Sequence, residues 1–267
     1  MIVLDLDGTL TNSKKEISPR TYDALMRAQE QKGLVVVLAS GRPTYGIVPL
    51  AKQLKLKEHG GYILSYNGGA IIDCRTGETV FNKDMSADTV PELYAEAKAA
   101  GMEILTYQGE SIAASCKDNK YVLHEAFINK MPVIQYDDFP SMLEYPINKC
   151  LIVGDPKPLH ELELKLAAKY EGRLMVYRSC GFFLECVPPG IEKSQSLARL
   201  IYSLGISREE TIAVGDGFND QGMIEYAGLG VAMANAPTEL QDIADYITWS
   251  NEEDGVAHVI EKFVLKG

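Results

Sequence analysis

The sequence predicts an α/β protein with a mainly parallel sheet built from both ends of the chain and an α+β segment inserted between them. Both end regions alternate short apolar runs with amphipathic helical segments, the pattern of a parallel sheet with crossover helices. The middle region has adjacent short strand-like runs, which are typical of a separate α+β module. We therefore expect two domains, formed by residues 1–81 with 188–267 and by residues 82–187.

The composition predicts a globular protein with small-molecule partners. Its 267 residues, 46% apolar and 24% charged, suffice for one large or two moderate domains. The net charge of −11 disfavours nucleic acid and anionic membranes, which reward a basic surface. No apolar run approaches the roughly 20 residues that span a bilayer, and no leader-like segment precedes Asp5. We expect a cytoplasmic protein without nucleic-acid or membrane partners.

The cysteines and histidines give little support to a zinc, disulfide or Cys/His mechanism. The five cysteines are scattered and include no C-x-x-C pair, and the four histidines are equally dispersed. We interpret the cysteines as reduced thiols, most of them buried or half-buried.

The first third of the chain is predicted to fold as strand, helix, strand. Ile2–Leu4 is an apolar run, Ser18 and Pro19 are suited to open a helix, and Gly33 is suited to close it. Residues 34–39 then form a second buried strand. Because neighbouring parallel strands end at one sheet edge, Asp5 and Ser40 should emerge there together.

The remaining elements follow from the same patterns. A third strand at 62–65 leads into a hairpin through 70–73. The middle region is expected to contain helices at about 86–100, 118–129 and 158–170, strands at 102–107, 111–115, 149–153, 174–177 and 182–187, and an irregular stretch at 131–145. The last third returns to the α/β pattern, with a helix at 193–204 and strands at 211–214 and 229–233.

Asp5 and Asp7 are the most informative residues of the chain. They end the first strand two residues apart, a spacing that should direct both carboxylates the same way. Gly8 and Thr9 allow a sharp turn and offer amide and hydroxyl donors to an anion. Two like charges this close require a proton or a divalent cation between them. The pair therefore indicates chemistry, although taken alone it also fits a solvated acidic loop.

Four distant segments should meet at the carboxyl edge of the parallel sheet, where ligands bind in open α/β folds. They are Asp5 with Asp7, Ser40, Lys193, and Asp216 with Asn219 and Asp220. Each group has a simpler reading by itself, as a helix cap, a solvated lysine or acids that favour a helix N-terminus. Their joint occurrence favours catalysis, and the oxygen-rich set suits Mg²⁺.

At this point the chain resembles the haloacid dehalogenase superfamily of phosphohydrolases. The matching motifs are Asp-x-Asp-Gly-Thr at 5–9, Ser-Gly-Arg at 40–42, the lysine at 193 and Gly-Asp-Gly-Phe-Asn-Asp at 215–220. Further motifs, at 65–69, 219–223, 230–233, 244–246 and 254–256, are similar to the Cof-like sugar-phosphatase branch. The resemblance spans essentially the whole chain and implies a Rossmann-like core with an inserted α/β cap of type IIB.

The resemblance implies a role for each motif residue. Asp5 would be the nucleophile that forms an aspartyl phosphate, and Asp7 the general acid/base. Mg²⁺ would be held by the carboxylate of Asp5, by Asp216 and by the backbone carbonyl of Asp7. Asp220 would either bind the metal directly or order the site from the next layer of residues around it. The residues implied in phosphate or substrate binding are Ser40, Gly41, Arg42, Asn67, Lys193 and Asn219. For Arg42 and Asn67, a surface arginine and a turn residue are the alternatives.

The chain departs from the family pattern at three positions. Glu192 precedes the lysine where a smaller residue is commoner, Ser194 follows it where glycine is common, and Ala234 occupies a position often held by glycine. None of these removes a catalytic group. Glu192 is the one that matters for function, because pairing with Lys193 would weaken the grip of that lysine on phosphate.

The resulting functional hypothesis is a Mg²⁺-dependent phosphatase acting on a small phosphorylated metabolite, with a sugar phosphate as the expected substrate. A phosphotransferase or mutase using the same aspartyl phosphate, and a low-turnover phosphate-binding regulatory module, are the alternatives. Linkers near 81–84 and 187–190 predict that the cap opens and closes. Candidate groups for the leaving alcohol are Lys117, Asn119, Tyr121, His124, Arg178 and Phe182. The oligomeric state is not readable from the sequence.

Overall fold

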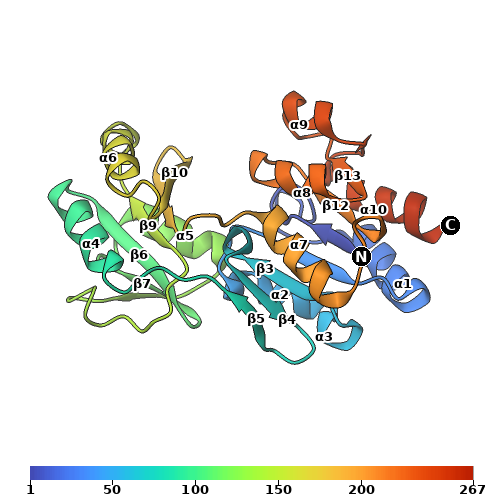
Figure 1. Cartoon of the computed structure of the whole chain (residues 1–267), viewed down its shortest axis with the longest axis horizontal. Helices are drawn as coiled ribbons and strands as arrows, with labels where there is room; N and C mark the ends of the chain where they lie inside the picture. The colour runs from blue at the N-terminus through green and yellow to red at the C-terminus, as the bar shows by residue number, and fades with distance from the viewer. Residues whose placement is uncertain (267) are drawn as a thin grey trace. The chain divides into compact units, whose positions relative to one another are not determined.

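The computed structural model describes residues 1–266 and divides into two compact units. The core unit comprises Met1–Phe81 and the chain from Glu192 onward, and the inserted unit comprises Asn82–Ile191 (Figure 1). The sequence-based division placed the second boundary at 188, at the Pro188-Pro189-Gly190 turn. The structure instead groups residues 188–191 with the inserted unit.

The core unit is built on an eight-stranded sheet, and the acidic pair directly follows its central strand β1 (Ile2–Leu4). Its strands, in spatial order, are β14 (Tyr246–Ile247), β13 (Leu229–Ala232), β12 (Ile212–Gly215), β1 (Ile2–Leu4), β2 (Val36–Ala39), β3 (Tyr62–Ser65), β4 (Ala70–Asp73) and β5 (Thr79–Asn82). All neighbours from β14 to β3 run parallel, and β3 and β4 form an antiparallel pair. Ile2 pairs with both Val36 and Ile212, so the two ends of the chain share one sheet.

Helices cover both faces of this sheet, because successive strand residues point to opposite sides. Ile2 and Leu4 join the apolar core beneath α1 (Pro19–Lys32), α2 (Thr44–Gln53), α3 (Leu56–His59) and α10 (Gly255–Ile260). Val3 joins the opposite core, with α7 (Lys193–Leu204) and α8 (Gln221–Tyr226). A further helix, α9 (Thr238–Ile243), packs on α8 and β13. The predicted α/β fold with a parallel-sheet core is confirmed.

The first helix begins and ends where the sequence predicts. The Ser18 hydroxyl accepts a hydrogen bond from the Thr21 amide, and Gly33 closes the helix in the left-handed conformation at φ 62°. Helix α1 therefore returns the chain for β2 to pair beside β1. Within residues 1–266 no helix is both long and apolar enough to cross a membrane.

The inserted unit is an α+β module with a six-stranded sheet of its own. In spatial order its strands are β10 (Met175–Cys180), β11 (Phe183–Val187), β9 (Cys150–Val153), β6 (Glu103–Gln108), β7 (Ser111–Ala114) and β8 (Val133–Gln135). Helices α4 (Thr89–Ala99) and α6 (Pro156–Lys169) close the apolar core on one face, and α5 (Lys120–Asn129) connects β7 to β8.

The expectation of an irregular stretch at 131–145 is wrong for three residues. Val133–Gln135 forms strand β8, which pairs parallel to β7 through Ile112 and Val133. This strand lies at the sheet edge, and Ile134 and Gln135 are exposed. It therefore lacks the alternation of apolar and polar residues by which a half-buried strand is recognised.

Candidate active site

The predicted site residues of the core unit lie where parallel strands end. Asp5 follows β1, Ser40 follows β2 and Asp216 follows β12, three neighbouring strands of the sheet. Lys193 is the first residue of α7, and Asp220 ends the short 3₁₀ turn η3 (Phe218–Asp220). The topology thus brings chain segments more than 200 residues apart to one sheet edge, as the hydrogen bond between Thr9 and Asp216 shows directly.

Asp5, Lys193 and Asp220 form a buried charged group. Lys193 Nζ donates to Asp5 Oδ1 at 2.5 Å and to Asp220 Oδ1 at 2.6 Å, and the lysine and Asp220 are each only 1% exposed. Burial, together with the charge of Asp220, raises the pKa of Asp5 to about 8. Burial opposes the charge on Lys193, but Asp220 and Asp5 outweigh it and raise its pKa. One cation is thus shared between two carboxylates.

Asp216 approaches this group from strand β12. Its Oδ1 accepts from the Thr9 hydroxyl at 2.6 Å, and Asn235 Nδ2 lies 3.5 Å from its Oδ2 while donating to the Gly8 carbonyl at 2.8 Å. Burial raises the pKa of Asp216 to about 6, against the hydrogen bond from Thr9. The Thr9 hydroxyl, which the sequence suggested as a donor to a bound anion, is therefore engaged with a carboxylate.

Two glycines make room for these carboxylates. Gly8 adopts a positive φ of 91°, and a Cβ there would overlap Asp216 Oδ2. A Cβ on Gly215 would overlap the Asp220 side chain, whose Oδ2 accepts from the amides of Asp216 at 3.1 Å and Gly217 at 3.0 Å. The turn after β12 is thereby fixed around Asp220.

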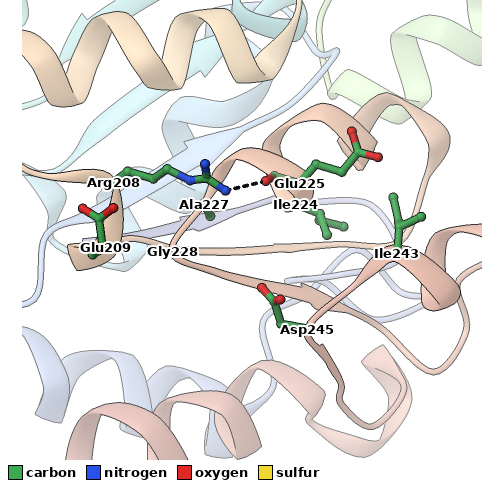
Figure 2. A pocket seen from close by; sticks show the side chains of 8 residues that line it. All are labelled: Arg208, Glu209, Ile224, Glu225, Ala227, Gly228, Ile243 and Asp245. Atoms are coloured by element: carbon green, nitrogen blue, oxygen red, sulfur yellow. Dashed lines mark hydrogen bonds between the residues drawn. The ribbon is translucent and has the colours of Figure 1, made fainter.

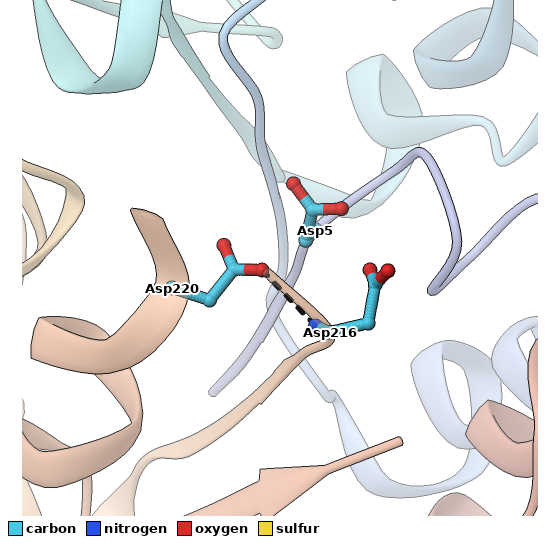
Figure 3. Close-up of side chains that lie close together, drawn as sticks. All are labelled: Asp5, Asp216 and Asp220. Carbon is cyan, nitrogen blue, oxygen red and sulfur yellow. Dashed lines mark hydrogen bonds between the residues drawn. The ribbon is translucent and has the colours of Figure 1, made fainter. Parts of the chain in front are cut away.

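The three carboxylates fit a hard divalent cation. One oxygen each of Asp5, Asp216 and Asp220 lies within 4.8 Å of the others; Asp5 comes from the turn after β1, and Asp216 and Asp220 come from the turn after β12 (Figure 3). An all-oxygen donor set of this kind is the one that Mg²⁺ prefers. With all three carboxylates ionised, this Asp5 cluster would have three negative charges against the one positive charge of Lys193, a surplus that a divalent cation would neutralise.

Asp7 lies in a different environment. Arg42 grips both of its oxygens, from Nε to Oδ2 at 2.7 Å and from Nη2 to Oδ1 at 2.5 Å, and Lys15 Nζ adds a third bond to Oδ1 at 2.7 Å. Although burial alone would raise it, Arg42 and Lys15 lower the pKa of Asp7. This Asp7 cluster contributes two cations to the site, and the Asp7 side chain is not among the grouped carboxylates.

Ser40, Asn67 and Asn219 lie on three loops that touch one another. The Ser40 hydroxyl accepts from the Arg42 amide at 3.1 Å, and the Ser40 carbonyl accepts from the Asn67 amide at 2.9 Å. Asn219 Nδ2 donates to Asn67 Oδ1 at 3.2 Å. Gly41 lies so close to Asn67 that an added Cβ would come within 3.2 Å of Asn67 Oδ1. The structure thus places all ten predicted site residues in the core unit, around one sheet edge.

A separate hollow of about 330 Å³ occupies the opposite edge of the sheet (Figure 2). Arg208, Gly228 and Asp245 line it just before β12, β13 and β14 begin. Arg208 donates across it to the Glu225 carbonyl at 3.0 Å. None of the predicted site residues lines this hollow, so we assign it no part in catalysis.

Comparison with known proteins decides the family. A family model described as haloacid dehalogenase-like hydrolase matches residues 2–260. The chain belongs to the haloacid dehalogenase-like hydrolase family. A Bacillus subtilis protein named phosphatase YwpJ is 32% identical over 285 residues, covering 98% of each chain. The chain is therefore an enzyme of the phosphatase class that the motifs predicted.

Solved structures agree with this assignment. A haloacid dehalogenase-like hydrolase from Bacteroides thetaiotaomicron is 51% identical, with a TM-score of 0.96 over 98% of each chain. A subclass IIB sugar phosphatase, 23% identical and covering 98% of each chain, has a TM-score of 0.79 and shares the fold. The predicted Rossmann-like core with an inserted cap of type IIB is confirmed.

The unusual Glu192 of this hydrolase does not pair with Lys193 among the described residues. Its carboxylate accepts a hydrogen bond from the Ser194 hydroxyl at 3.4 Å, and Lys193 points to Asp5 and Asp220 instead. Glu192 is exposed whereas Lys193 is buried, because the helix begins between them. The suggested weakening of the lysine by its neighbour is not found.

Sequence reasoning missed two residues of the hydrolase that contact the acidic turn, Lys15 and Asn235. Lys15 stands in a Ser-Lys-Lys-Glu run that looks like a solvated loop, and Asn235 in an Ala-Asn-Ala-Pro loop. The only available signals were the nearness of Lys15 to Asp7 in sequence and the position of Asn235 shortly after a parallel strand.

The candidate substrate-binding residues of the inserted unit differ in the contacts that they make within it. Asn119 caps α5 by accepting from the amides of Tyr121 and Val122, and Arg178 is paired with Glu163 at 2.6 Å. Asn119 and Arg178 therefore each stabilise the structure of the inserted unit. Tyr121 stacks on Phe182 with ring centroids 5.0 Å apart, and His124 packs edge-on against the same ring. Their expected contact with substrate stays a prediction.

Proposed function

We propose that this hydrolase is a Mg²⁺-dependent phosphatase that hydrolyses a small phosphorylated metabolite, a sugar phosphate, through an aspartyl phosphate on Asp5. The observation that carries the proposal is the Asp5 cluster, in which three carboxylates and one buried lysine converge at the carboxyl edge of a parallel sheet. A metal, a phosphate dianion and a lysine ammonium are the partners that such a group would bring together. The sugar phosphatase of like fold supports the substrate class.

The metal would be held by Asp5, Asp216 and Asp220, with the backbone carbonyl of Asp7 as a further oxygen ligand. When bound, Mg²⁺ would neutralise the carboxylates and draw charge from the phosphoryl oxygens. Asp220 already accepts from two amides and Lys193, so its role is chiefly to orient the group.

Asp5 and Asp7 divide the covalent chemistry. An Asp5 carboxylate oxygen bonds to phosphorus as the ester P–O bond breaks, and Asp7 gives a proton to the departing alkoxide. Asp7 then takes a proton from the water that attacks phosphorus. The bond to Asp5 breaks, and inorganic phosphate leaves with Asp5 and Asp7 restored.

Lys193, Ser40 and Asn219 would bind the phosphoryl group. Lys193 supplies a buried positive charge that needs no reorganisation during the reaction. Because the Ser40 oxygen accepts from the Arg42 amide, its hydroxyl proton remains to donate to a phosphoryl oxygen. Asn219 stands beside Asn67 at the exposed rim. Together they would stabilise charge on the transferring group.

The test is phosphate release from a panel of metabolite phosphates, with and without Mg²⁺, by the wild-type protein and by Asp5→Asn. We expect Mg²⁺-dependent release that falls at least about 10⁴-fold in Asp5→Asn, while the melting temperature is kept. Asp23→Asn, which alters an exposed carboxylate of α1, is the matched control. Unchanged turnover in Asp5→Asn would contradict the nucleophile assignment.

A further inference from the structure

Lys15 is a second cation bonded to Asp7, whose two carboxylate oxygens already accept hydrogen bonds from Arg42. Arg42 donates to both oxygens of Asp7 through a two-point fork, the strongest geometry for such a pair. Lys15 adds a third bond, to Oδ1 at 2.7 Å. Holding Asp7 in place does not require this lysine, so its presence at the site calls for another explanation.

The loop that carries Lys15 holds this residue in an uncommon backbone conformation. Lys15 has a φ of 61°, a conformation that costs a residue with a side chain about 1 kcal/mol or more. Asn12 Oδ1 accepts from the amides of both Lys14 and Glu16, which closes the loop on itself. A strained backbone conformation of this kind persists only where the surrounding structure holds it in place.

The rest of the core unit holds this loop from outside. The Ser13 amide donates to Glu252 Oε1 at 2.6 Å, and Asn251 Nδ2 donates to the Thr11 carbonyl at 2.9 Å. Both partners belong to the turn η4 (Asn251–Glu253), about 240 residues further along the chain. Contacts from a distant segment therefore reinforce the position of Lys15.

The charges of the two clusters call for different ligands. With its three carboxylates ionised, the Asp5 cluster would have a surplus of two negative charges, which a divalent cation matches. The Asp7 cluster has two cations and one carboxylate, a surplus of one positive charge in a chain whose net charge is −11. The Arg42 side chain is only 10% exposed, whereas that of Lys15 is 42% exposed. Lys15 is thus the cation that a ligand can reach.

We propose that Lys15 binds an anionic group on the leaving part of the substrate, so that the preferred substrate carries a carboxylate or a second phosphate besides the transferred phosphoryl group. This inference rests on the proposed function, in which Asp7 serves the leaving oxygen. Lys15 Nζ exchanges Asp7 Oδ1 for an oxygen of that second anion. Asp7 keeps its orientation because the Arg42 fork stays in place.

The experiment compares kcat/KM for matched substrates with Mg²⁺ present. One pair is 6-phosphogluconate and glucose 6-phosphate, which tests a carboxylate, and the other is fructose 1,6-bisphosphate and fructose 6-phosphate, which tests a second phosphate. We expect one anionic member to be preferred by about tenfold or more, chiefly through KM. Lys15→Met should lower that preference by about ten- to a hundredfold, and Lys15→Arg should retain part of it.

Lys14→Met is the matched control, because Lys14 is the adjacent lysine and its exposed side chain has no hydrogen bond or ion pair among residues 1–266. It should leave the preference unchanged. Melting curves for all variants report folding, and the ratio of two substrates on one variant cancels any loss of active protein.

The possible outcomes separate this inference from the proposed function. One outcome is hydrolysis of p-nitrophenyl phosphate and of the sugar phosphates without a second anionic group, with no preference for 6-phosphogluconate or fructose 1,6-bisphosphate. That result would overturn the role of Lys15 alone. A preference that persists in Lys15→Met would do the same. Absence of Mg²⁺-dependent hydrolysis of every compound, p-nitrophenyl phosphate included, would overturn both.

Discussion

Asp5 and Asp7 stand two residues apart on one turn, yet their surroundings have opposite character. Asp5 is buried beside Asp220, shares Lys193 with it, and has a pKa raised to about 8. Asp7 is held by Arg42 and Lys15, which lower its pKa despite partial burial. Two neighbouring carboxylates thus become chemically distinct through their environments alone. In the metal-free protein the order of their pKa values is opposite to the one that a nucleophilic Asp5 and a proton-donating Asp7 require, and a divalent cation bound at Asp5 would favour its ionised form.

The origin of the partners explains the difference. Lys193 and Asp220 come from the last third of the chain, whereas Lys15 and Arg42 come from the first. The two-residue spacing predicted that both side chains point the same way, but strand β1 ends at Leu4 and its alternation does not continue through the turn. Within residues 1–266 the two carboxylates have no common hydrogen-bond partner.

Apart from loss of the proposed nucleophile, replacing the carboxylate on the cationic side should give the largest effect on rate. Asp7→Asn keeps the shape of the side chain but cannot transfer a proton, so kcat should fall by about 10²- to 10⁴-fold. Steady-state kinetics with p-nitrophenyl phosphate measure this loss, and calorimetric titration with Mg²⁺ shows whether the metal still binds. Full turnover in Asp7→Asn would remove its assigned role.

Removing the shared cation of the Asp5 cluster should cost stability as well as phosphate binding. Lys193→Met leaves Asp5 and Asp220 buried without their ammonium partner, and the free energy of unfolding should fall by about 3 to 5 kcal/mol in metal-free buffer. Urea unfolding measures the change. Lys52→Met, an exposed lysine of α2, should shift stability by less than about 0.5 kcal/mol. Equal stability of the two variants would show that the pairing contributes little.

The raised pKa values predict an unusual pH dependence for the metal-free protein. A carboxyl with a higher pKa in the folded state binds extra protons there, so stability is greatest at low pH and is lost as pH rises from about 4 toward 8. For Asp216, with a pKa raised from 3.8 to about 6, the full loss is on the order of 3 kcal/mol. In EDTA, the melting temperature of the wild-type protein should fall between pH 5 and pH 8 by more than that of Asp216→Asn. The difference between the two series reports the contribution of Asp216.

Mg²⁺ should reverse this trend, because it binds the ionised carboxylates and stabilises the folded state by mass action. The same melting series in excess Mg²⁺ is the measurement. A metal-free protein whose stability rises over this pH range, with no dependence on Asp216, would show that the clustered carboxylates are not mutually destabilising.

The smallest change should follow from the contact that joins Asp216 to the acidic turn. Asn235→Ala removes the hydrogen bond to the Gly8 carbonyl and the contact near Asp216 Oδ2, and should weaken Mg²⁺ binding by about ten- to a hundredfold. Calorimetric titration measures the affinity. Gln241→Ala is a control that alters a neighbouring side-chain amide, which within residues 1–266 donates only to the carbonyls of Ala234 and Ala236.

The parts of the site that follow strand ends were predictable from sequence. Parallel pairing places Asp5, Ser40 and Asp216 at one edge whatever the loops do, and the structure shows β1 between β2 and β12. The core fold followed for the same reason, because buried strands and capped helices leave periodic patterns.

What escaped prediction depends on the conformation of loops. The bond from Lys15 to Asp7 requires a left-handed backbone at Lys15, and Asn235 reaches Gly8 only because β13 ends beside β12. The absence of a Glu192–Lys193 pair depends on which residue begins α7. Such contacts involve single side chains without periodicity, so no sequence pattern marks them.

Strand β1 pairs with both β2 and β12, and this pairing has a consequence for synthesis of the chain. At 5 to 20 residues per second, β12 follows β1 from the ribosome after roughly 10 to 40 s. The inserted unit has by then emerged whole. The nascent protein therefore cannot bring the residues of the proposed catalytic site together until most of translation is over.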